Sequence, residues 1–224
     1  MARFEKKPTA AFSPYYGCFI ILTAVLVFGG LITWTVYSLL SQDRQISQFT
    51  VDEPVPLPAV AVSPEARAVL EKKLAEFDSA VKASRPATVT LSVPELNALL
   101  AIAPDTGHGS YTQMVHIRGT DPARNALVAD VCLPMNRLKF WEGKKRYLIG
   151  DAVFAVEAGD EGVDAKVIDM KVPGKEVPQG FVHNLETFGW IAPYRKLESL
   201  GATLKAVKTA SVTAEGLTLS APAE

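Results

Sequence analysis

Cysteine is nearly absent from this chain. The 224 residues include two cysteines, Cys18 and Cys132. Cys18 lies in a long apolar run and Cys132 far outside it, so the sequence predicts neither an internal disulfide nor a metal site built from cysteine. A domain without such links must be stabilised by its own hydrophobic core. We expect Cys132, which lies between Val131 and Leu133, to occupy a buried apolar position.

An excess of positive charge is also missing. The chain has 23 Lys and Arg against 24 Asp and Glu, a formal net charge of −1. A general nucleic-acid binder needs a basic surface to displace the counterions of the phosphate backbone. We therefore predict no nucleic-acid partner.

Histidine is rare, and the chain has no recognisable catalytic motif. His108, His116 and His183 are isolated in sequence, and none has a second ligand at metal-binding spacing. The Gly-rich loop around His108 is not accompanied by a G-x-S-x-G nucleophile motif. The sequence thus predicts no metal ligand, no cofactor and no cofactor-binding residue.

Carboxylates are numerous but scattered along the chain. The alternation of a strand predicts that Asp164 and Asp169 lie on opposite faces, so these two cannot converge locally. A pair assembled from distant positions is the remaining alternative for a hydrolase. We predict no catalytic residue and expect that the protein is not an enzyme.

The longest uncharged run covers residues 17–40 and reads GCFIILTAVLVFGGLITWTVYSLL. As a helix it would be about 36 Å long, enough to cross a hydrocarbon core of about 30 Å. A secretion signal has a shorter apolar region followed by a small-x-small cleavage site, and this run ends without one. A core helix would show a polar stripe. We predict an uncleaved transmembrane helix.

The charges that flank this helix predict its orientation. Arg3, Lys6 and Lys7 precede it, whereas Arg44 is the one basic residue in the twenty that follow. By the positive-inside rule, residues 1–16 form a cytoplasmic tail and the remainder is extracytoplasmic. The expected location is a bacterial-type inner or plasma membrane.

The exported part divides into a stalk and a domain. Residues 41–62 are predicted to be a stalk, because Pro54, Pro56 and Pro58 alternate with apolar residues and favour extended backbone. Residues 63–224 are long enough for one α+β domain.

Two capped helices are expected at the start of the domain. Ser63 is a helix N-cap, and the apolar spacing that follows it stops before Pro86. Ser92 and Glu95 form a capping box for a second helix that ends near Pro104.

Beyond residue 110 the apolar period changes to two, which is typical of strands. Strands are predicted over 87–91, 111–118, 127–133, 146–158, 163–172, 202–212 and 217–220, and helical segments over 179–188 and 194–200. The fold class is therefore α+β, with one antiparallel sheet of about five or six strands and two to four helices.

A basic and aromatic segment is the main candidate for surface contact. Residues 137–147 contain five cations, one anion and three aromatic residues, a mixture that suits an anionic membrane surface. The alternative, which we prefer, is an ordinary hairpin with Glu142-Gly143-Lys144 as its turn. The candidate membrane-contact residues are Arg137, Lys139, Phe140, Trp141, Lys144, Lys145 and Arg146.

Two short segments carry a family resemblance. Residues 91–100 read LSVPELNALL, and residues 172–178 read VPGKEVP. Together with the N-terminal anchor, they make residues 87–220 resemble the small membrane-anchored extracytoplasmic proteins of the YpmS-like type, in which an L-[ST]-x-x-E-L-N-x-L-L segment precedes a sheet. The resemblance implies an architecture but carries over no catalytic residue.

These observations favour a non-catalytic, membrane-tethered domain that binds a lipid-like or apolar ligand. The alternatives are a cell-envelope scaffold or assembly partner without a ligand and, third, an envelope hydrolase. The predicted partners are the lipid bilayer through residues 17–40 and either a lipid-like ligand or an envelope protein. A cavity of roughly 300 Å³ or more with aliphatic walls would favour ligand binding over a scaffold. Residues 170–178 are either a lip over such a cavity or a plain strand-to-helix connection.

Overall fold

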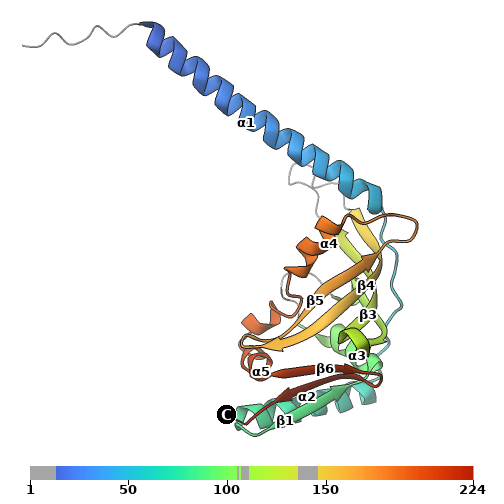
Figure 1. Ribbon diagram of the computed structural model, residues 1–224. Coiled ribbons are helices and arrows are strands. Elements are labelled where there is room, and N and C mark those ends of the chain that lie inside the picture. The colour runs from blue at the N-terminus through green and yellow to red at the C-terminus, as the bar shows by residue number, and fades with distance from the viewer. Residues whose placement is uncertain (1–13, 105, 107–110, 136–145, 224) are drawn as a thin grey trace, which may run out of the picture. The chain divides into compact units, whose positions relative to one another are not determined.

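The computed structural model describes residues 14–104, 106, 111–135 and 146–223 (Figure 1). The chain divides into two compact units, Met1–Ile46 and Ser47–Glu224. Each unit is described by itself below, and the second is called the C-terminal domain.

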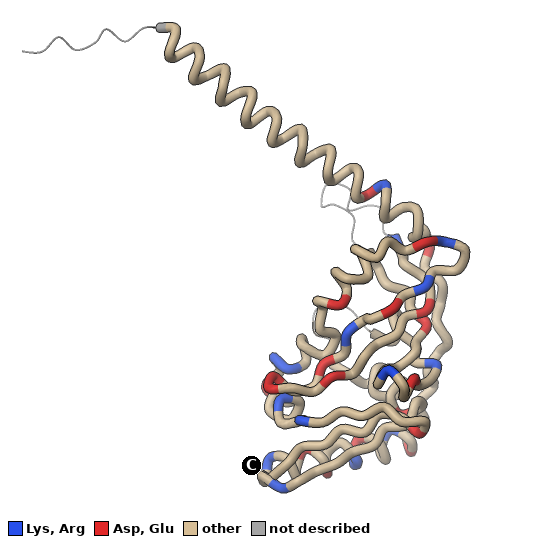
Figure 2. The backbone as a smooth tube through the Cα atoms, viewed as in Figure 1, with Lys and Arg blue, Asp and Glu red and all other residues tan. Residues whose placement is uncertain are grey.

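Helix α1 covers Pro14–Phe49 and contains the predicted apolar helix. It carries no charged residue before Asp43, as Figure 2 shows. Its length and composition suffice to cross a membrane, and its most apolar stretch is not buried. A membrane anchor and a signal sequence share these properties.

Part of the segment predicted as a stalk, residues 41–62, has regular structure. Helix α1 continues to Phe49, because Ser41–Phe49 contains neither proline nor glycine. Phe49 is 2% exposed, and its ring lies 4.9 Å from that of Phe181. The backbone of Val51 then pairs with that of Tyr147, with N···O distances of 2.9 and 2.7 Å. Residues 41–49 of the predicted stalk thus belong to helix α1, and Phe49 and Val51 pack or pair with the rest of the C-terminal domain.

Both predicted helix starts are confirmed. Helix α2 covers Pro64–Lys82, and the Ser63 hydroxyl accepts a hydrogen bond from the backbone N–H of Ala66. Helix α3 covers Val93–Ile102 and begins with the capping box of Ser92 and Glu95.

The strands form two antiparallel sheets, where the sequence predicts one. The four-stranded sheet has the order β2-β3-β4-β5, and the three-stranded sheet has the order β1-β7-β6. The two sheets are separate because β1 pairs with β7, near the C-terminus, and not with a strand of the four-stranded sheet. Val89 of β1 lies opposite Leu219 of β7. The strands are β1 (Ala87–Leu91), β2 (Val115–Asp121), β3 (Ala126–Met135), β4 (Arg146–Gly159), β5 (Gly162–Lys171), β6 (Thr209–Thr213) and β7 (Gly216–Ala221).

The remaining elements include two short helices, α4 (Gln179–Glu186) and α5 (Gly201–Ala206). The predicted strand over 202–212 is wrong in its first half, where α5 lies. Thr203 of α5 donates a hydrogen bond to the Asp78 carboxylate on α2, a tertiary contact that no local pattern reveals. The predicted helical segment over 194–200 is one 3-10 turn, η4 (Tyr194–Lys196).

Two further 3-10 turns, η1 (Tyr111–Gln113) and η2 (Pro122–Arg124), flank β2. For this reason the strand predicted over 111–118 begins only at Val115. Cys132 on β3 is 3% exposed, as expected. Figure 1 shows α2 running along the three-stranded sheet and α4 lying beside the four-stranded sheet.

Candidate functional site

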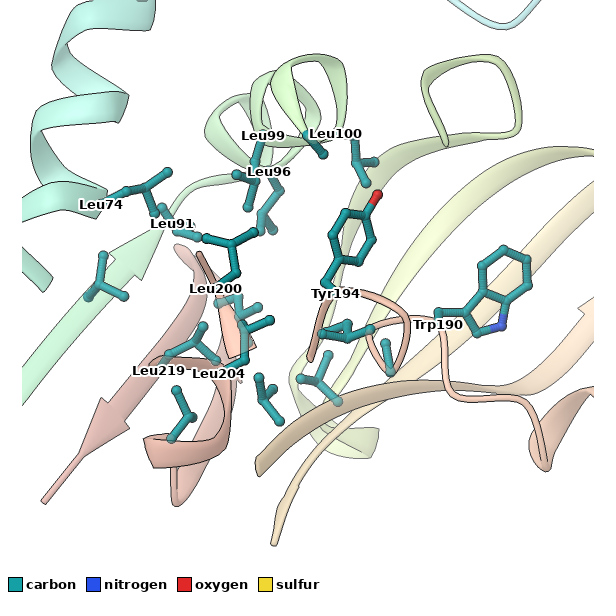
Figure 3. Close-up of a pocket in the computed structure, with 18 of the residues that line it drawn as sticks. Leu74, Leu91, Leu96, Leu99, Leu100, Trp190, Tyr194, Leu200, Leu204 and Leu219 are labelled. Carbon is teal, nitrogen blue, oxygen red and sulfur yellow. The ribbon is translucent and has the colours of Figure 1, made fainter. Parts of the chain in front are cut away.

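An apolar cavity lies between the two sheets of the C-terminal domain. Its volume is about 310 Å³, and Figure 3 shows leucines from several helices and strands around it together with Tyr194 and Trp190. Strands of both sheets form its floor. The fully buried floor residues are Val89, Leu91, Val115, Ile117, Leu127, Phe154, Val156, Val163 and Leu217.

The rim of the cavity comes from helices and from one loop. Many of its residues are half-buried, whereas most of the strand residues in the lining are buried. The half-buried rim residues are Leu74 and Asp78 on α2, Leu99 and Leu100 on α3, Ala103 after it, Trp190, Ile191 and Tyr194, and Leu200 and Leu204 at α5.

Helix α5 reaches the rim through a close contact at the β4–β5 turn. Gly162 has φ +96°, a conformation that favours glycine, and a Cβ there would lie 2.3 Å from the carbonyl oxygen of Leu204. The turn therefore needs glycine both for its backbone conformation and for the approach of α5.

Aromatic side chains form one wall of the cavity. The Tyr111 ring lies 5.8 Å from the rings of both Trp190 and Tyr194, and the Phe154 ring packs edge-on against Trp190 at 5.3 Å. Separations of this size are favourable for aromatic pairs. The Tyr111 hydroxyl donates a hydrogen bond to the Trp190 carbonyl oxygen at 3.3 Å. Burial, together with the nearby Asp164 carboxylate, raises the pKa of Tyr111.

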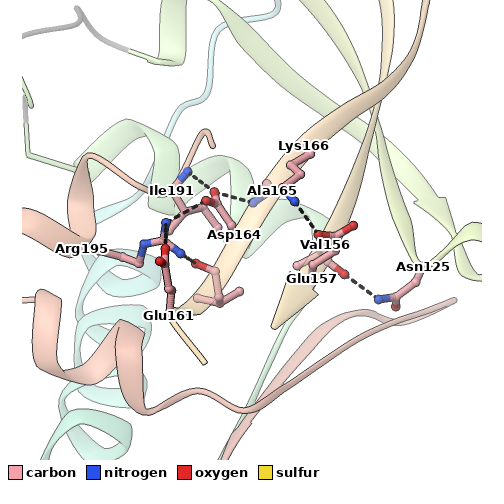
Figure 4. Close-up of polar contacts among 10 residues, drawn as sticks. Asn125, Val156, Glu157, Glu161, Asp164, Ala165, Lys166, Ile191 and Arg195 are labelled. Carbon is pink, nitrogen blue, oxygen red and sulfur yellow. Dashed lines mark hydrogen bonds and ion pairs between the residues drawn. The ribbon is translucent and has the colours of Figure 1, made fainter. Parts of the chain in front are cut away.

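A buried carboxylate holds this wall in place. Asp164 Oδ1 accepts a hydrogen bond from the backbone N–H of Ile191 at 3.0 Å, and Asp164 Oδ2 accepts one from Arg195 at 3.0 Å (Figure 4). The backbone N–H of Trp190 donates to the carbonyl oxygen of Ala165 at 3.0 Å. A Cβ on Gly189 would lie 2.1 Å from Asp164 Oδ2, so the segment can approach the carboxylate only with glycine there.

Asn125 joins the two sheets beside the cavity. It lies at the end of η2 with φ 51°, and its side-chain amide donates to the carbonyl oxygens of Val156 on β4 and Ala210 on β6, at 2.7 and 3.1 Å. Its Oδ1 accepts from the N–H of Val212 at 2.7 Å. Three hydrogen bonds from one side chain therefore fix the spacing of the sheets.

Asn97 joins helix α3 to strand β2, which contributes to the floor. Its side chain pairs with both backbone groups of Ile117, at 2.7 and 2.8 Å, and the residue is 6% exposed. Helix α3 is thereby fastened to the edge strand β2. The amide satisfies backbone groups that would otherwise be buried without a partner.

The wall carries little charge. Asp78 is the single ionised side chain among the described residues that line the cavity. Its carboxylate accepts hydrogen bonds from Lys82 Nζ, at 2.7 Å, and from the Thr203 hydroxyl. The hydrogen bond from Lys82, followed by that from Thr203, lowers the pKa of Asp78 below its ordinary value of 3.8.

Of the candidate membrane-contact residues, the structure describes Arg146 alone. Arg137, Lys139, Phe140, Trp141, Lys144 and Lys145 lie outside the described residues, so their role stays a prediction. Arg146 begins β4, its side chain is 14% exposed, and its Nε lies 4.0 Å from Asp52 Oδ1.

The histidines form no site within the described part of the chain. His108 lies outside it, and His116 on β2 is half-buried. His183 Nδ1 lies 3.0 Å from Glu186 Oε2, but both are exposed neighbours one turn apart on α4 and neither lines the cavity. In residues 14–104, 106, 111–135 and 146–223, no three His, Cys, Asp or Glu side chains are placed to hold a metal ion.

The strand register and the cavity lining decide two further predictions, one on the faces of Asp164 and Asp169 and one on the role of residues 170–178. Asp164 and Asp169 share a face of the sheet, contrary to the prediction, because an extra residue in β5 opposite Val153 and Phe154 interrupts the alternation. The two carboxylates have different partners: Asp169 Oδ2 lies 3.6 Å from Arg124 Nη1, and Asp164 Oδ2 lies 3.0 Å from Arg195 Nη2. Residues 170–178 do not line the cavity and are a strand-to-helix connection closed by a Val172↔Lys175 bridge.

Sequence reasoning missed Asp78, Asn97 and Asn125. One of them left a signal: Asp78 lies four residues after Leu74, on the apolar stripe of α2, where a charge is unexpected. The asparagines leave none, because their partners are 20 to 87 residues away.

The fold and the site define a class of protein: a two-sheet α+β domain, preceded by an apolar helix, that encloses an apolar cavity. No family model matches the chain, and neither a curated protein nor a solved structure is significantly similar to it. These comparisons do not bear on the resemblance to YpmS-like proteins, which stays a prediction.

Proposed function

We propose that this protein is a single-pass, membrane-anchored protein whose extracytoplasmic domain binds a lipid-like ligand without catalysing a reaction. The observation that carries the proposal is the cavity of about 310 Å³ with aliphatic and aromatic walls. Ligand sites typically have volumes of about 300–1,000 Å³, mostly apolar walls and a few polar groups.

The size of the cavity suits one alkyl chain. A methylene group fills roughly 30 Å³, close to the volume that one water molecule takes in the liquid. The cavity is therefore large enough for an alkyl chain of several such groups. Each buried methylene contributes about 0.8 kcal/mol, or roughly a fourfold gain in affinity.

The anchor supports the same function. Helix α1 is uncharged over the predicted span 17–40, and Arg3, Lys6 and Lys7 precede it. An uncleaved helix in this orientation keeps the domain at a bilayer surface, where amphiphiles are concentrated. The charge pattern favours a cytoplasmic N-terminus in a bacterial-type inner or plasma membrane.

A chain-length series tests the ligand. Full-length protein is transferred from detergent to an amphipathic polymer, and 1-alkanols of 6 to 16 carbons compete with N-phenyl-1-naphthylamine, an uncharged fluorescent probe. We expect affinity to rise about fourfold per methylene and to level off within the series, once the chain is longer than the cavity can hold. Native mass spectrometry of the same sample checks for a ligand that copurifies.

Two matched variants locate the binding. Ala103→Trp places a large ring at the rim of the cavity, whereas Ala101→Trp makes the same change at an exposed position of α3 that does not line it. Ala103→Trp should abolish probe binding, and Ala101→Trp should leave it unchanged. Equal binding by both variants, or no chain-length dependence, would reject the cavity as the site and favour a scaffold, to be pursued by cross-linking in membranes.

A labelling experiment tests the topology. Ser79→Cys on the exposed face of α2 should react with a membrane-impermeant maleimide in intact cells, and Ala10→Cys should react only after permeabilisation. The reverse pattern would contradict the proposed orientation.

A further inference from the structure

The head group of the ligand can be inferred from the charges around the cavity. Among the described residues that line it, Asp78 is the one ionised group, and there is no Lys, Arg or His. Its side chain is 30% exposed, so it lies at the rim, where the polar end of a chain held in the cavity would emerge.

Asp78 lines the cavity, and its ion-pair partner Lys82 lies on the solvent side. Lys82, which donates to Asp78 Oδ2, is 59% exposed and does not line the cavity. Thr203 lines the cavity, is 8% exposed and donates to Asp78 Oδ1. Each carboxylate oxygen can accept a further hydrogen bond, so the rim offers an acceptor for a hydroxyl group of the ligand.

The aromatic wall offers no compensating cation. Arg195 lies beside this wall, but it already donates to Asp164 Oδ2 at 3.0 Å and to the Val163 carbonyl oxygen at 3.4 Å. Glu161 also lies 3.9 Å from it, so two acidic groups surround one guanidinium. An anionic head group would therefore meet excess negative charge at this end as well.

We propose that the ligand is a single-chain amphiphile with an uncharged, hydroxyl-bearing head, such as a long-chain alcohol or a monoacylglycerol, that donates a hydrogen bond to Asp78. This inference rests on the proposed function and adds the class of head group. A carboxylate or phosphate head is disfavoured because like charges a few ångströms apart repel even when solvent screens them partly.

The test compares head groups on one chain length. Full-length protein in the amphipathic polymer is titrated at pH 8 with 1-dodecanol, 1-monolauroylglycerol and dodecanoate, each competing with N-phenyl-1-naphthylamine. The two uncharged compounds should displace the probe at concentrations at least tenfold lower than dodecanoate does. Asp78→Asn should improve dodecanoate at least fivefold, and Lys82→Gln should leave the uncharged compounds unchanged.

A second measurement does not depend on any variant. As the pH falls from 8 to 5, dodecanoate becomes partly protonated while Asp78 stays ionised, since its pKa is lowered. Displacement by dodecanoate should improve over this range, and displacement by 1-dodecanol should not change.

Three outcomes would overturn the inference. The first is that dodecanoate binds the unmodified protein as tightly as the two uncharged compounds do. Another is dodecanoate binding that Lys82→Gln weakens, which would make Lys82 the head-group partner. The third is displacement by none of the three compounds, and this one would also reject the proposed function, whereas the first two leave chain binding intact.

Discussion

The four-stranded sheet borders two different interiors in the C-terminal domain. Near the start of β4, Leu148 pairs with Leu133, both are at most 6% exposed, and Phe49 packs against Phe181. We call this the filled region. At the other end, where Leu127 pairs with Phe154, the sheet borders the cavity of about 310 Å³, here called the hollow region.

The difference does not lie in the kinds of residue. Both regions are built from Leu, Val and Phe, yet a phenylalanine from the end of α1 enters the filled region, whereas α2, α3 and α5 leave several of their leucines half-buried around the hollow region. Protein interiors are normally packed as densely as organic crystals. A hollow of this size in an otherwise dense domain is therefore a reason to expect a ligand.

Truncations in the two regions should have very different costs. Phe49→Ala should lower the free energy of unfolding by about 3–5 kcal/mol, because it leaves a cavity in a packed site. Leu99→Ala should cost only about 1 kcal/mol, because Leu99 is already half-buried beside open space. Denaturant titration of the full chain in detergent, followed by hydrogen exchange of the β3 and β4 amides, measures both. Equal losses would contradict the distinction.

Loss of the bridge between the sheets should come next. Asn125→Ala removes three hydrogen bonds and puts alanine at φ 51°, so we expect a loss of about 2–4 kcal/mol in the free energy of unfolding. Asn125→Gly is the matched variant, because glycine accepts that φ, and it should recover about 1 kcal/mol of this loss. If the two variants are equally stable, backbone strain does not contribute at this position.

Enlarging a buried alanine should also cost different amounts of stability in the two regions. Ala129 is fully buried and does not line the cavity, so Ala129→Leu should overpack the sheet and cost about 1–3 kcal/mol. Ala165 lines the cavity, and Ala165→Leu should change stability by less than about 0.5 kcal/mol while it weakens binding of the fluorescent probe. The same unfolding and displacement measurements check both. An equal cost at the two alanines would mean that the hollow region has no usable space.

The smallest effect should be a loosening of the rim in acid. Glu95 on α3 bonds to Lys73 Nζ of α2 at 2.8 Å and to Ser92. Burial alone would raise the pKa of Glu95, but the hydrogen bonds from Lys73 and Ser92 outweigh it and hold the pKa below its ordinary value of 4.5. The stabilisation is therefore complete above that value and is lost as the pH falls through the lower, folded-state pKa.

Glu95→Gln should accordingly cost about 1 kcal/mol at neutral pH and flatten the decline of stability below pH 5. Hydrogen exchange of the α3 amides at pH 6 and pH 4 measures this. Glu71→Gln, on the exposed side of α2, is the control and should behave like the unmodified protein. A decline as steep in Glu95→Gln as in the unmodified protein would assign the acid effect to another group.

Local features of this protein follow from the sequence because their causes lie within a few residues. The apolar helix over 17–40, the Ser63 cap, the Ser92–Glu95 capping box and most strand positions are of this kind. The short helix α5 is different: six residues are too few to be stable alone, and the contact of Thr203 with Asp78, 125 residues away, helps to hold it.

The division into two sheets and the cavity between them belong to the tertiary structure alone. Leu91, Leu127 and Leu217 look like ordinary core positions in the sequence, and each is buried as such positions should be. That they surround about 310 Å³ of space depends on strand pairing, on the Asn125 bridge and on the placement of α2, α3 and α5. Residues of the right kind can be recognised one at a time, but an unfilled volume is a property of how distant elements are spaced.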